Sequence, residues 1–183
     1  MRIDPISFFG AVEGWRSGDG DRPRKFLAEA PRWRRSDREC FYFDLLVWSL
    51  MLGEEGFAAA LVDAGLPVSS RDTRRQTPLL FFTERDNPGA VRLLLEKGAD
   101  PTEGLVCAVQ CCNLELVDLF LAENADIGAI NDDAVSLVRV HADVLRHLVA
   151  AGARMPDNIL EMLANRTALG DSGSPSLPER RRK

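Results

Sequence analysis

The segment from Thr77 to Pro101 constrains the fold most, because it describes two short helices with a defined start, turn and end. Thr77 can cap the first helix, and Pro78 suits a first helical turn, where its missing N–H does no harm. The Asn-Pro-Gly sequence at 87–89 separates the helices, and Gly98 ends the second in the left-handed conformation that glycine adopts cheaply. Their apolar faces are Leu79, Leu80 and Phe82, then Val91, Leu93, Leu94 and Leu95. Two such helices cannot bury this surface alone, so the pattern predicts further copies on both sides.

This segment resembles the ankyrin repeat, a turn and two helices of about 33 residues. The resemblance rests on Thr77-Pro78-Leu79, on Val91-x-x-Leu94-Leu95 and on Gly98-Ala99-Asp100. The chain departs from the family pattern after Leu79, where Leu80, Phe81 and Phe82 replace a histidine and two alanines. The resemblance implies an all-α solenoid of stacked helix-turn-helix units with short fingers and helical caps.

Alignment on Gly98 predicts about four repeats over residues 40–166. The first, Cys40–Pro67, is degenerate and ends at Gly65; the third ends at Asn124, and the fourth ends at Gly152. Asparagine is a sensible stop because it tolerates left-handed geometry. The predicted apolar stripe of the first repeat is Phe41, Leu45, Trp48 and Leu52.

The spacing of these stops predicts one full-length finger, the β-turn loop that precedes a repeat. Gly98 follows Gly65 by 33 residues, but Asn124 follows Gly98 by only 26. Val68–Gln76 is therefore the one full finger, and the fourth repeat is also trimmed. Asp72 sits where the family has aspartate, whereas Arg75 replaces the usual glycine, which predicts a looser finger.

The two ends of the chain lack the repeat pattern. We expect residues 1–39 to form an N-terminal helical cap and basic connector, with Ile6, Phe9 and Val12 on the packed face of a helix over 4–15. A helix over 156–165 should close the array through Ile159, Leu160 and Leu163. Residues 167–183 are rich in Gly, Ser, Pro and Arg and predict a disordered basic tail.

Composition and charge narrow the class of partner. Residues 41–177 hold 10 basic and 20 acidic residues, so the body repels phosphate backbones and attracts basic proteins. No apolar run approaches the ~20 residues of a membrane span, and no secretory signal is evident. Four cysteines, two of them adjacent, predict a reduced, cytoplasmic protein. Twenty arginines against three lysines favour a GC-rich, bacterial source.

The ankyrin resemblance implies that the concave helix face and the finger hold a partner. In the family register, Trp48 and Phe81 are equivalent first-helix positions, and each is either a core residue or an aromatic anchor for the partner. The expected partner-binding residues are Trp48, Met51, Asp72, Thr73, Arg74, Gln76, Phe81, Glu84, Arg85 and Gln110.

No set of residues predicts catalysis, a metal, a cofactor or a small-molecule substrate. Cys107 and Cys111 share a helix face but have no nearby histidine, so packing as small apolar residues is favoured over zinc binding. His141 and His147, the only histidines, lack an oriented nucleophile. An enzyme or enzyme accessory that uses His141 or the cysteines remains the less favoured class.

The leading hypothesis is a non-catalytic protein-binding module, and specifically an inhibitor or immunity protein that masks a basic toxin or nuclease. The alternative is a nucleic-acid-associated accessory protein that uses the Arg-rich connector at 22–38 and the tail at 180–183. Acidic residues interspersed in the connector weaken its field, so binding to nucleic acid is disfavoured.

Overall fold

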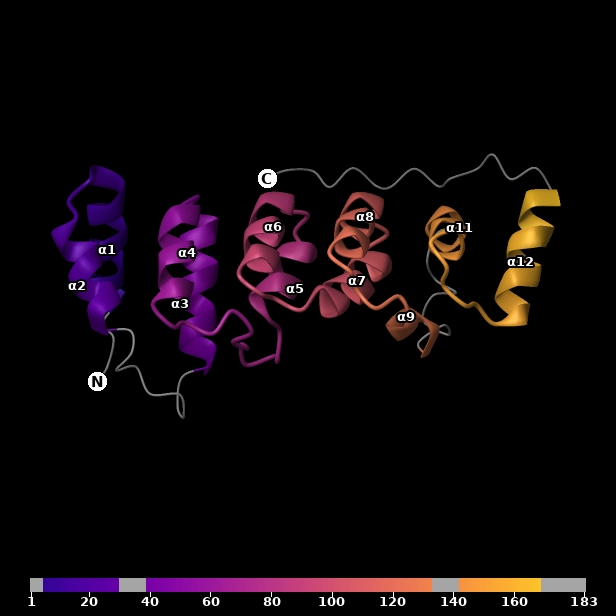
Figure 1. Cartoon of the computed structure of the whole chain (residues 1–183), viewed down its shortest axis with the longest axis horizontal. Helices are drawn as coiled ribbons and strands as arrows, with labels where there is room; N and C mark the ends of the chain where they lie inside the picture. The colour runs from indigo at the N-terminus through magenta and orange to yellow at the C-terminus, as the bar shows by residue number, and fades with distance from the viewer. Residues whose placement is uncertain (1–4, 30–38, 133–141, 169–183) are drawn as a thin grey trace.

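The computed structural model describes residues 5–29, 39–132 and 142–168, and this part of the chain contains α-helices and no strand. The all-α expectation is therefore confirmed. The helices are α1 (Pro5–Ser17), α2 (Asp21–Glu29), α3 (Glu39–Met51), α4 (Glu55–Asp63), α5 (Pro78–Thr83), α6 (Pro88–Glu96), α7 (Pro101–Gln110), α8 (Leu114–Ala122), α9 (Gly128–Asp132), α11 (Ala142–Ala150) and α12 (Asp157–Ala168). They lie in one elongated row, with α1 and α2 at one end and α12 at the other (Figure 1).

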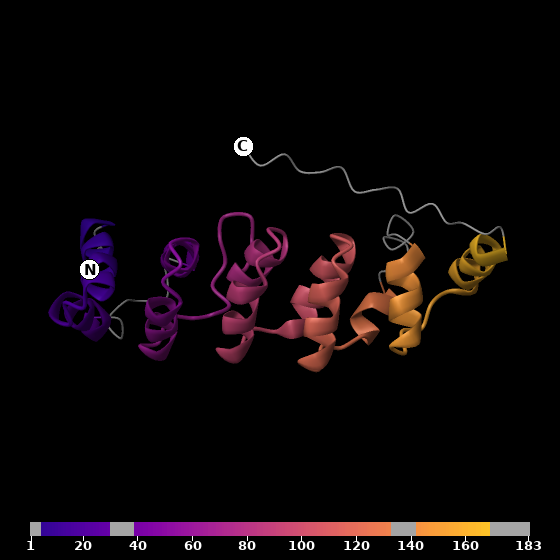
Figure 2. The same cartoon turned by 90° about the horizontal axis from the view of Figure 1, so that it is seen from above.

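Consecutive helices pair, and the pairs follow one another along the row (Figure 2). The closest pairs are α1 with α2, α3 with α4, α5 with α6 and α7 with α8. The first helices α3, α5 and α7 also contact one another in sequence, and α4 contacts α6. From α3 to α7, the first helices therefore lie in one layer, and α4 and α6 lie in a second.

Local chemistry sets where these helices begin. The Thr77 hydroxyl accepts a hydrogen bond from the amide of Leu80 at 3.3 Å, with Pro78 in the first turn of α5. Asn87 and Asn113 cap α6 and α8 in the same way, each through its side-chain oxygen and the amide three residues later. Asp100 caps α7 through the amide of Thr102. Each side chain satisfies an amide that lacks an intrahelical partner.

The predicted stops repeat the same geometry. Gly65, Gly98, Asn124 and Gly152 all have positive φ angles, between 62° and 103°. After each stop, the next amide donates to the carbonyl five residues earlier, as Ala99 does to Leu94 at 2.9 Å and Ala125 does to Phe120 at 3.0 Å. The four units thus end identically, although their spacing in the sequence differs.

One apolar core runs along the whole row. Leu46, Leu79 and Leu105 occupy equivalent positions of the first helices and are buried. The second helices place Leu61, Leu94, Phe120 and Leu148 at equivalent positions, all with no exposed surface. At one end, Phe57 of α4 is covered by Phe8 and Phe26, whose ring centroids lie 6.2 and 6.3 Å away. The proposed domain boundary at residue 39 stays a prediction, and the tail beyond Ala168 lies outside the described residues.

Three predicted apolar faces are partly wrong. In α1 the packed residues are Phe8, Ala11 and Val12, whereas Ile6 and Phe9 are 79% and 46% exposed. In α12, Ile159 and Leu163 are buried as predicted, but Leu160 is 40% exposed. Phe8, Ala11 and Val12 lie at i, i+3 and i+4, so the buried face of α1 is rotated about the helix axis from the predicted face.

The stripe predicted for the first repeat also fails in part. Leu45 is buried, but Trp48 and Leu52 are each 42% exposed, and the side chain of Phe41 lies outside the described residues. The packed residues of α3 are Tyr42, Phe43, Leu45, Leu46, Val47 and Leu50. So many apolar residues in one helix leave its buried face undetermined by sequence, since they surround most of the helix.

Candidate protein-binding surface

The outward sides of α3, α5 and α7, together with the finger at 68–76, form a surface that we call the first-helix surface. Met51, Glu84 and Gln110 lie at equivalent positions near the ends of these helices, and all three are exposed. Asp44, Trp48 and Met51 are spaced four and three residues apart, which places them on one side of α3. Of the other expected contact residues, Thr73, Arg74 and Arg85 are exposed, and Asp72 and Gln76 are half-buried.

An apolar patch occupies the α3 end of this surface. The ring of Trp48 stacks on that of Phe9 from α1, with centroids 5.4 Å apart and an interplanar angle of 27°. Met51 is 63% exposed, and Leu52, which directly follows the end of α3, donates its amide hydrogen to the Trp48 carbonyl at 3.0 Å. We define the apolar patch as Phe9, Trp48, Met51 and Leu52. Sequence reasoning assigned Phe9 and Leu52 to the core, whereas the structure leaves them 46% and 42% exposed.

Phe81 and Trp48 have different environments, although they occupy equivalent positions in the repeat register. Phe81 is half-buried and makes edge-to-face contacts with Phe43 and Phe82, at centroid distances of 5.8 and 5.1 Å. The Arg85 guanidinium covers the ring at 3.5 Å from its centroid and donates to the Phe81 carbonyl at 3.0 Å. Phe81 therefore belongs to the margin of the core, whereas Trp48 offers an exposed aromatic face.

The finger is closed by Asp72. Its Oδ1 atom accepts hydrogen bonds from the amides of Arg74 and Gln76 at 2.8 and 2.7 Å, while its own amide donates to the Gln76 carbonyl at 3.0 Å. Arg75 adopts the left-handed conformation with a φ of 63°. The Arg71 guanidinium donates a hydrogen bond to the Arg75 carbonyl at 2.8 Å. The aspartate turn thus closes the finger without the usual glycine, and the looseness of the finger stays a prediction.

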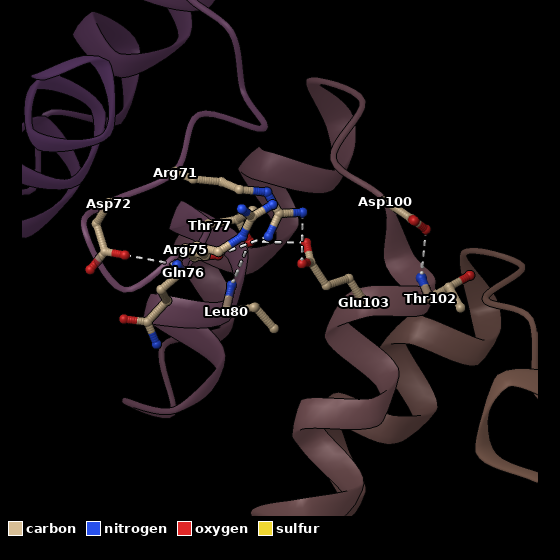
Figure 3. Close-up of polar contacts among 9 residues, drawn as sticks. All are labelled: Arg71, Asp72, Arg75, Gln76, Thr77, Leu80, Asp100, Thr102 and Glu103. Carbon is tan, nitrogen blue, oxygen red and sulfur yellow. Dashed lines mark hydrogen bonds and ion pairs between the residues drawn. The ribbon is translucent and has the colours of Figure 1, made fainter. Parts of the chain in front are cut away.

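Polar contacts join the finger to the next helix pair (Figure 3). Arg71 forms an ion pair with Glu103 of α7 at 3.2 Å, and the Thr77 hydroxyl donates to the other carboxylate oxygen of Glu103 at 3.2 Å. A groove of about 450 Å³ lies beside these contacts, between the finger and the start of α7. Its lining residues are Val68, Ser69, Arg71, Thr77, Leu79, Ala99, Asp100, Thr102, Glu103 and Val106.

Asp44 of α3 and Asp72 of the finger place two carboxylates near each other, and the finger also carries Arg71, Arg74 and Arg75. Partial burial, together with the negative charge of Asp72 on the finger, raises the pKa of the Asp44 carboxyl above its usual range. Asp44 and Asp72 thus oppose each other electrostatically across the junction of α3 and the finger. Such a pair favours an approaching cation.

Cys107 of α7 is buried and carries a neutral thiol. Burial, and then the proximity of Cys111, raises the pKa of the Cys107 thiol to about 12, so it is neutral near pH 7. A neutral thiol is neither a strong nucleophile nor a good metal ligand. Within the described ranges, no three His, Cys, Asp or Glu side chains are grouped as a metal site requires.

His147 of α11 contacts Asp118 of α8 at 2.5 Å and joins neighbouring helix pairs. His141 lies outside the described residues. Most of the Arg-rich connector also lies outside them. In its described portion, Arg22 pairs with Asp19 at 3.6 Å.

In the part of the chain that the structure describes, no helix combines the length and apolar character needed to cross a bilayer.

The comparison with known proteins supports the repeat assignment. Over 126 residues the chain is 28% identical to "Ankyrin repeat, SAM and basic leucine zipper domain-containing protein 1" of Echinops telfairi. The match covers 62% of this chain and 25% of the relative, so the chain spans about a quarter of that protein's length. No family model matches the chain. The similarity and the all-helical structure fit ankyrin-like repeats, a class that generally binds other proteins and suggests a non-enzymatic interaction module.

Proposed function

We propose that the chain is an ankyrin-repeat solenoid that binds a partner protein through the first-helix surface and the finger. The observation that carries this proposal is the apolar patch, in which Trp48 stacks on Phe9 and the exposed Met51 and Leu52 follow at the end of α3. Large exposed apolar side chains that gather in one place are typical of interaction sites. Aromatic residues such as Trp48 supply much of the binding energy in such sites.

The surrounding charges favour a basic partner. Asp44, four residues before Trp48 on α3, and Asp72 of the finger offer carboxylates, and Glu84 offers a third at the end of α5, where it pairs with Arg85 at 4.0 Å. The proposed contact residues are Trp48, Met51, Asp72, Thr73, Arg74, Gln76, Glu84, Arg85 and Gln110, with Phe81 supporting Arg85 from below. Complementary charge would steer association more than it would add affinity.

The finer proposal is an inhibitory role in a bacterial cytoplasm, in which the chain masks a basic toxin or nuclease. The acidic balance of residues 41–177 supports it, since a nuclease presents a basic surface to its substrate. An inhibitor of this kind covers that surface with carboxylates. Its association rate should therefore fall as salt concentration rises.

The test is capture of the partner with the tagged full chain in an extract of its source. Met51→Glu places a charge in the exposed centre of the patch and should raise the Kd by about tenfold or more. Leu160→Glu is the matched control, because Leu160 is 40% exposed on α12, away from the patch. Wild type and Leu160→Glu should capture one stoichiometric protein that Met51→Glu loses. Equal capture by all three chains, or no stoichiometric partner, would overturn the proposal.

A further inference from the structure

The finger at 68–76 has no neighbour of its own kind in the described part of the chain. Asp100 caps α7 directly after the stop at Gly98, so no loop projects before this helix pair. The next pair begins in the same abrupt way, with Asp126 hydrogen-bonded to the amide of Gly128 at the start of α9. One flank of the finger therefore faces a space that another finger could have filled.

This space is the groove of about 450 Å³ between the finger and α7. The side chains of Val68, Leu79, Ala99 and Val106 give it an apolar lining, and Leu79 and Ala99 are buried. Its size lies within the ~300–1,000 Å³ of typical ligand sites, so it can take several side-chain groups. An apolar lining favours binding of an apolar group, because that group displaces water from the groove.

Two residues at the groove have backbone groups without a hydrogen-bond partner among the described residues. Among the hydrogen bonds of the described residues, none involves the backbone N–H or C=O of Ser69 or Arg71. Both residues line the groove. Backbone groups of this kind form strong hydrogen bonds when another chain approaches, and they recognise a peptide whatever its sequence.

The groove also carries an excess of negative charge. Asp100 and Glu103 line it, and Arg71 is the one cation among its lining residues. Arg71 is already engaged with Glu103 and with the Arg75 carbonyl. Asp100 is exposed, and one of its carboxylate oxygens accepts the hydrogen bond that caps α7. A lysine or arginine side chain would complement this arrangement.

We propose that the groove beside the lone finger binds an extended peptide segment that carries a lysine or arginine. The segment takes the place of a second finger, hydrogen-bonds to the backbone of Ser69 and Arg71, and directs its cation to Asp100. This inference rests on the proposed function, because the segment belongs to the partner protein. A second copy of this chain is a poorer occupant, since residues 41–177 hold twice as many acidic as basic residues and like charges repel.

The probe is a library of random 12-residue peptides displayed on phage and selected on the full chain. Selected peptides should contain lysine or arginine and should shift the Ser69 and Arg71 amide signals in ¹⁵N NMR spectra. Hydrogen exchange at these two amides should slow in proportion to occupancy. Asp100→Asn keeps the capping oxygen while removing the charge, and should weaken binding about two- to fivefold at low salt. Asp157→Asn, at the start of α12, is the matched control and should bind normally.

Each other outcome contradicts the inference in a distinguishable way. If Met51→Glu abolishes peptide binding and Asp100→Asn leaves it unchanged, the peptides bind the apolar patch. That result would overturn the proposed groove site and keep the proposed function. Concentration-dependent dimers that shift the Ser69 and Arg71 signals would make a second copy the occupant. If no peptide is selected although circular dichroism shows a folded chain, the proposed peptide site in the groove is also overturned. The capture experiment with Met51→Glu would still test the proposed function separately.

Discussion

Gly104 of α7 tests how tightly the third helix pair is packed. A Cβ atom built on Gly104 would overlap two ring atoms of Phe120 and lie 3.0 Å from a third. Phe120 belongs to α8 and has no exposed surface, so its ring has no free space to enter. We therefore expect Gly104→Ala to force α7 and α8 apart or to push Phe120 out of its rotamer.

The magnitude follows from two opposing effects. Inserting a methyl group into a packed core costs about 1–3 kcal/mol, and the overlap with two ring atoms of Phe120 puts Gly104→Ala in the upper part of that range, at about 2–3 kcal/mol. Alanine gains about 1 kcal/mol over glycine inside a helix. The net loss should be about 1–2 kcal/mol in the free energy of unfolding. For a chain of this size it corresponds to a decrease in Tm of about 2–8 °C.

Urea denaturation followed by circular dichroism measures this change, with Gly10→Ala as the matched control. Gly10 lies inside α1, and a Cβ there would meet nothing within 4 Å. Gly10→Ala should therefore stabilise the chain by about 0.5–1 kcal/mol, the opposite sign for the same substitution. Phe120→Leu should cost less in the Gly104→Ala background than alone. A Gly104→Ala protein as stable as wild type would refute the close approach of α7 and α8.

Three further predictions concern stability. Thr77→Ala removes the α5 cap and the contact with Glu103 and should cost about 1–2 kcal/mol, whereas Thr77→Ser keeps the oxygen and should cost less; urea denaturation compares them. The buried Ser70 hydroxyl has no hydrogen-bond partner within the described structure, so Ser70→Ala should leave stability unchanged or raise it by up to about 1 kcal/mol in the same assay. The unfolded Cys107 thiol loses its proton near its usual pKa of 9.0 but the folded one only near 12, so the unfolded state binds fewer protons in this window. Unfolding free energy measured from pH 8 to 10.5 should fall above pH 9, by at most about 1.4 kcal/mol per pH unit.

The controls for these three changes are specific. Equal losses for Thr77→Ala and Thr77→Ser would show that the hydroxyl does not cap α5. A large destabilisation by Ser70→Ala would show that its hydroxyl has a partner in solution. The pH effect of Cys107 is the difference between wild type and Cys107→Ala, because other groups titrate in the same range. Parallel pH profiles for the two proteins would contradict a buried neutral thiol.

Sequence reasoning located the helix boundaries of the second and third pairs well, because each depends on a few neighbouring atoms. Thr77 caps α5 and Gly98 ends α6 through contacts within a few residues. Asn124 could be recognised as a stop although it is not glycine, since its left-handed conformation is also a local property. The finger was placed correctly from spacing, but its closure was not. Asp72 supplies two hydrogen bonds that outweigh the strain expected at Arg75.

The sequence by itself thus determined the repeated helix pairs, their caps and stops, and the presence of one long finger. Only the tertiary structure decided which apolar residues are buried: Phe81 lies under Arg85 and against Phe43, while Trp48 keeps an open face. The pairing of Arg71 with Glu103 and the approach of Phe120 to Gly104 are tertiary in the same way. The physical reason is that caps and stops are satisfied within one turn of helix. Burial and grooves depend instead on which distant segment packs against each side chain.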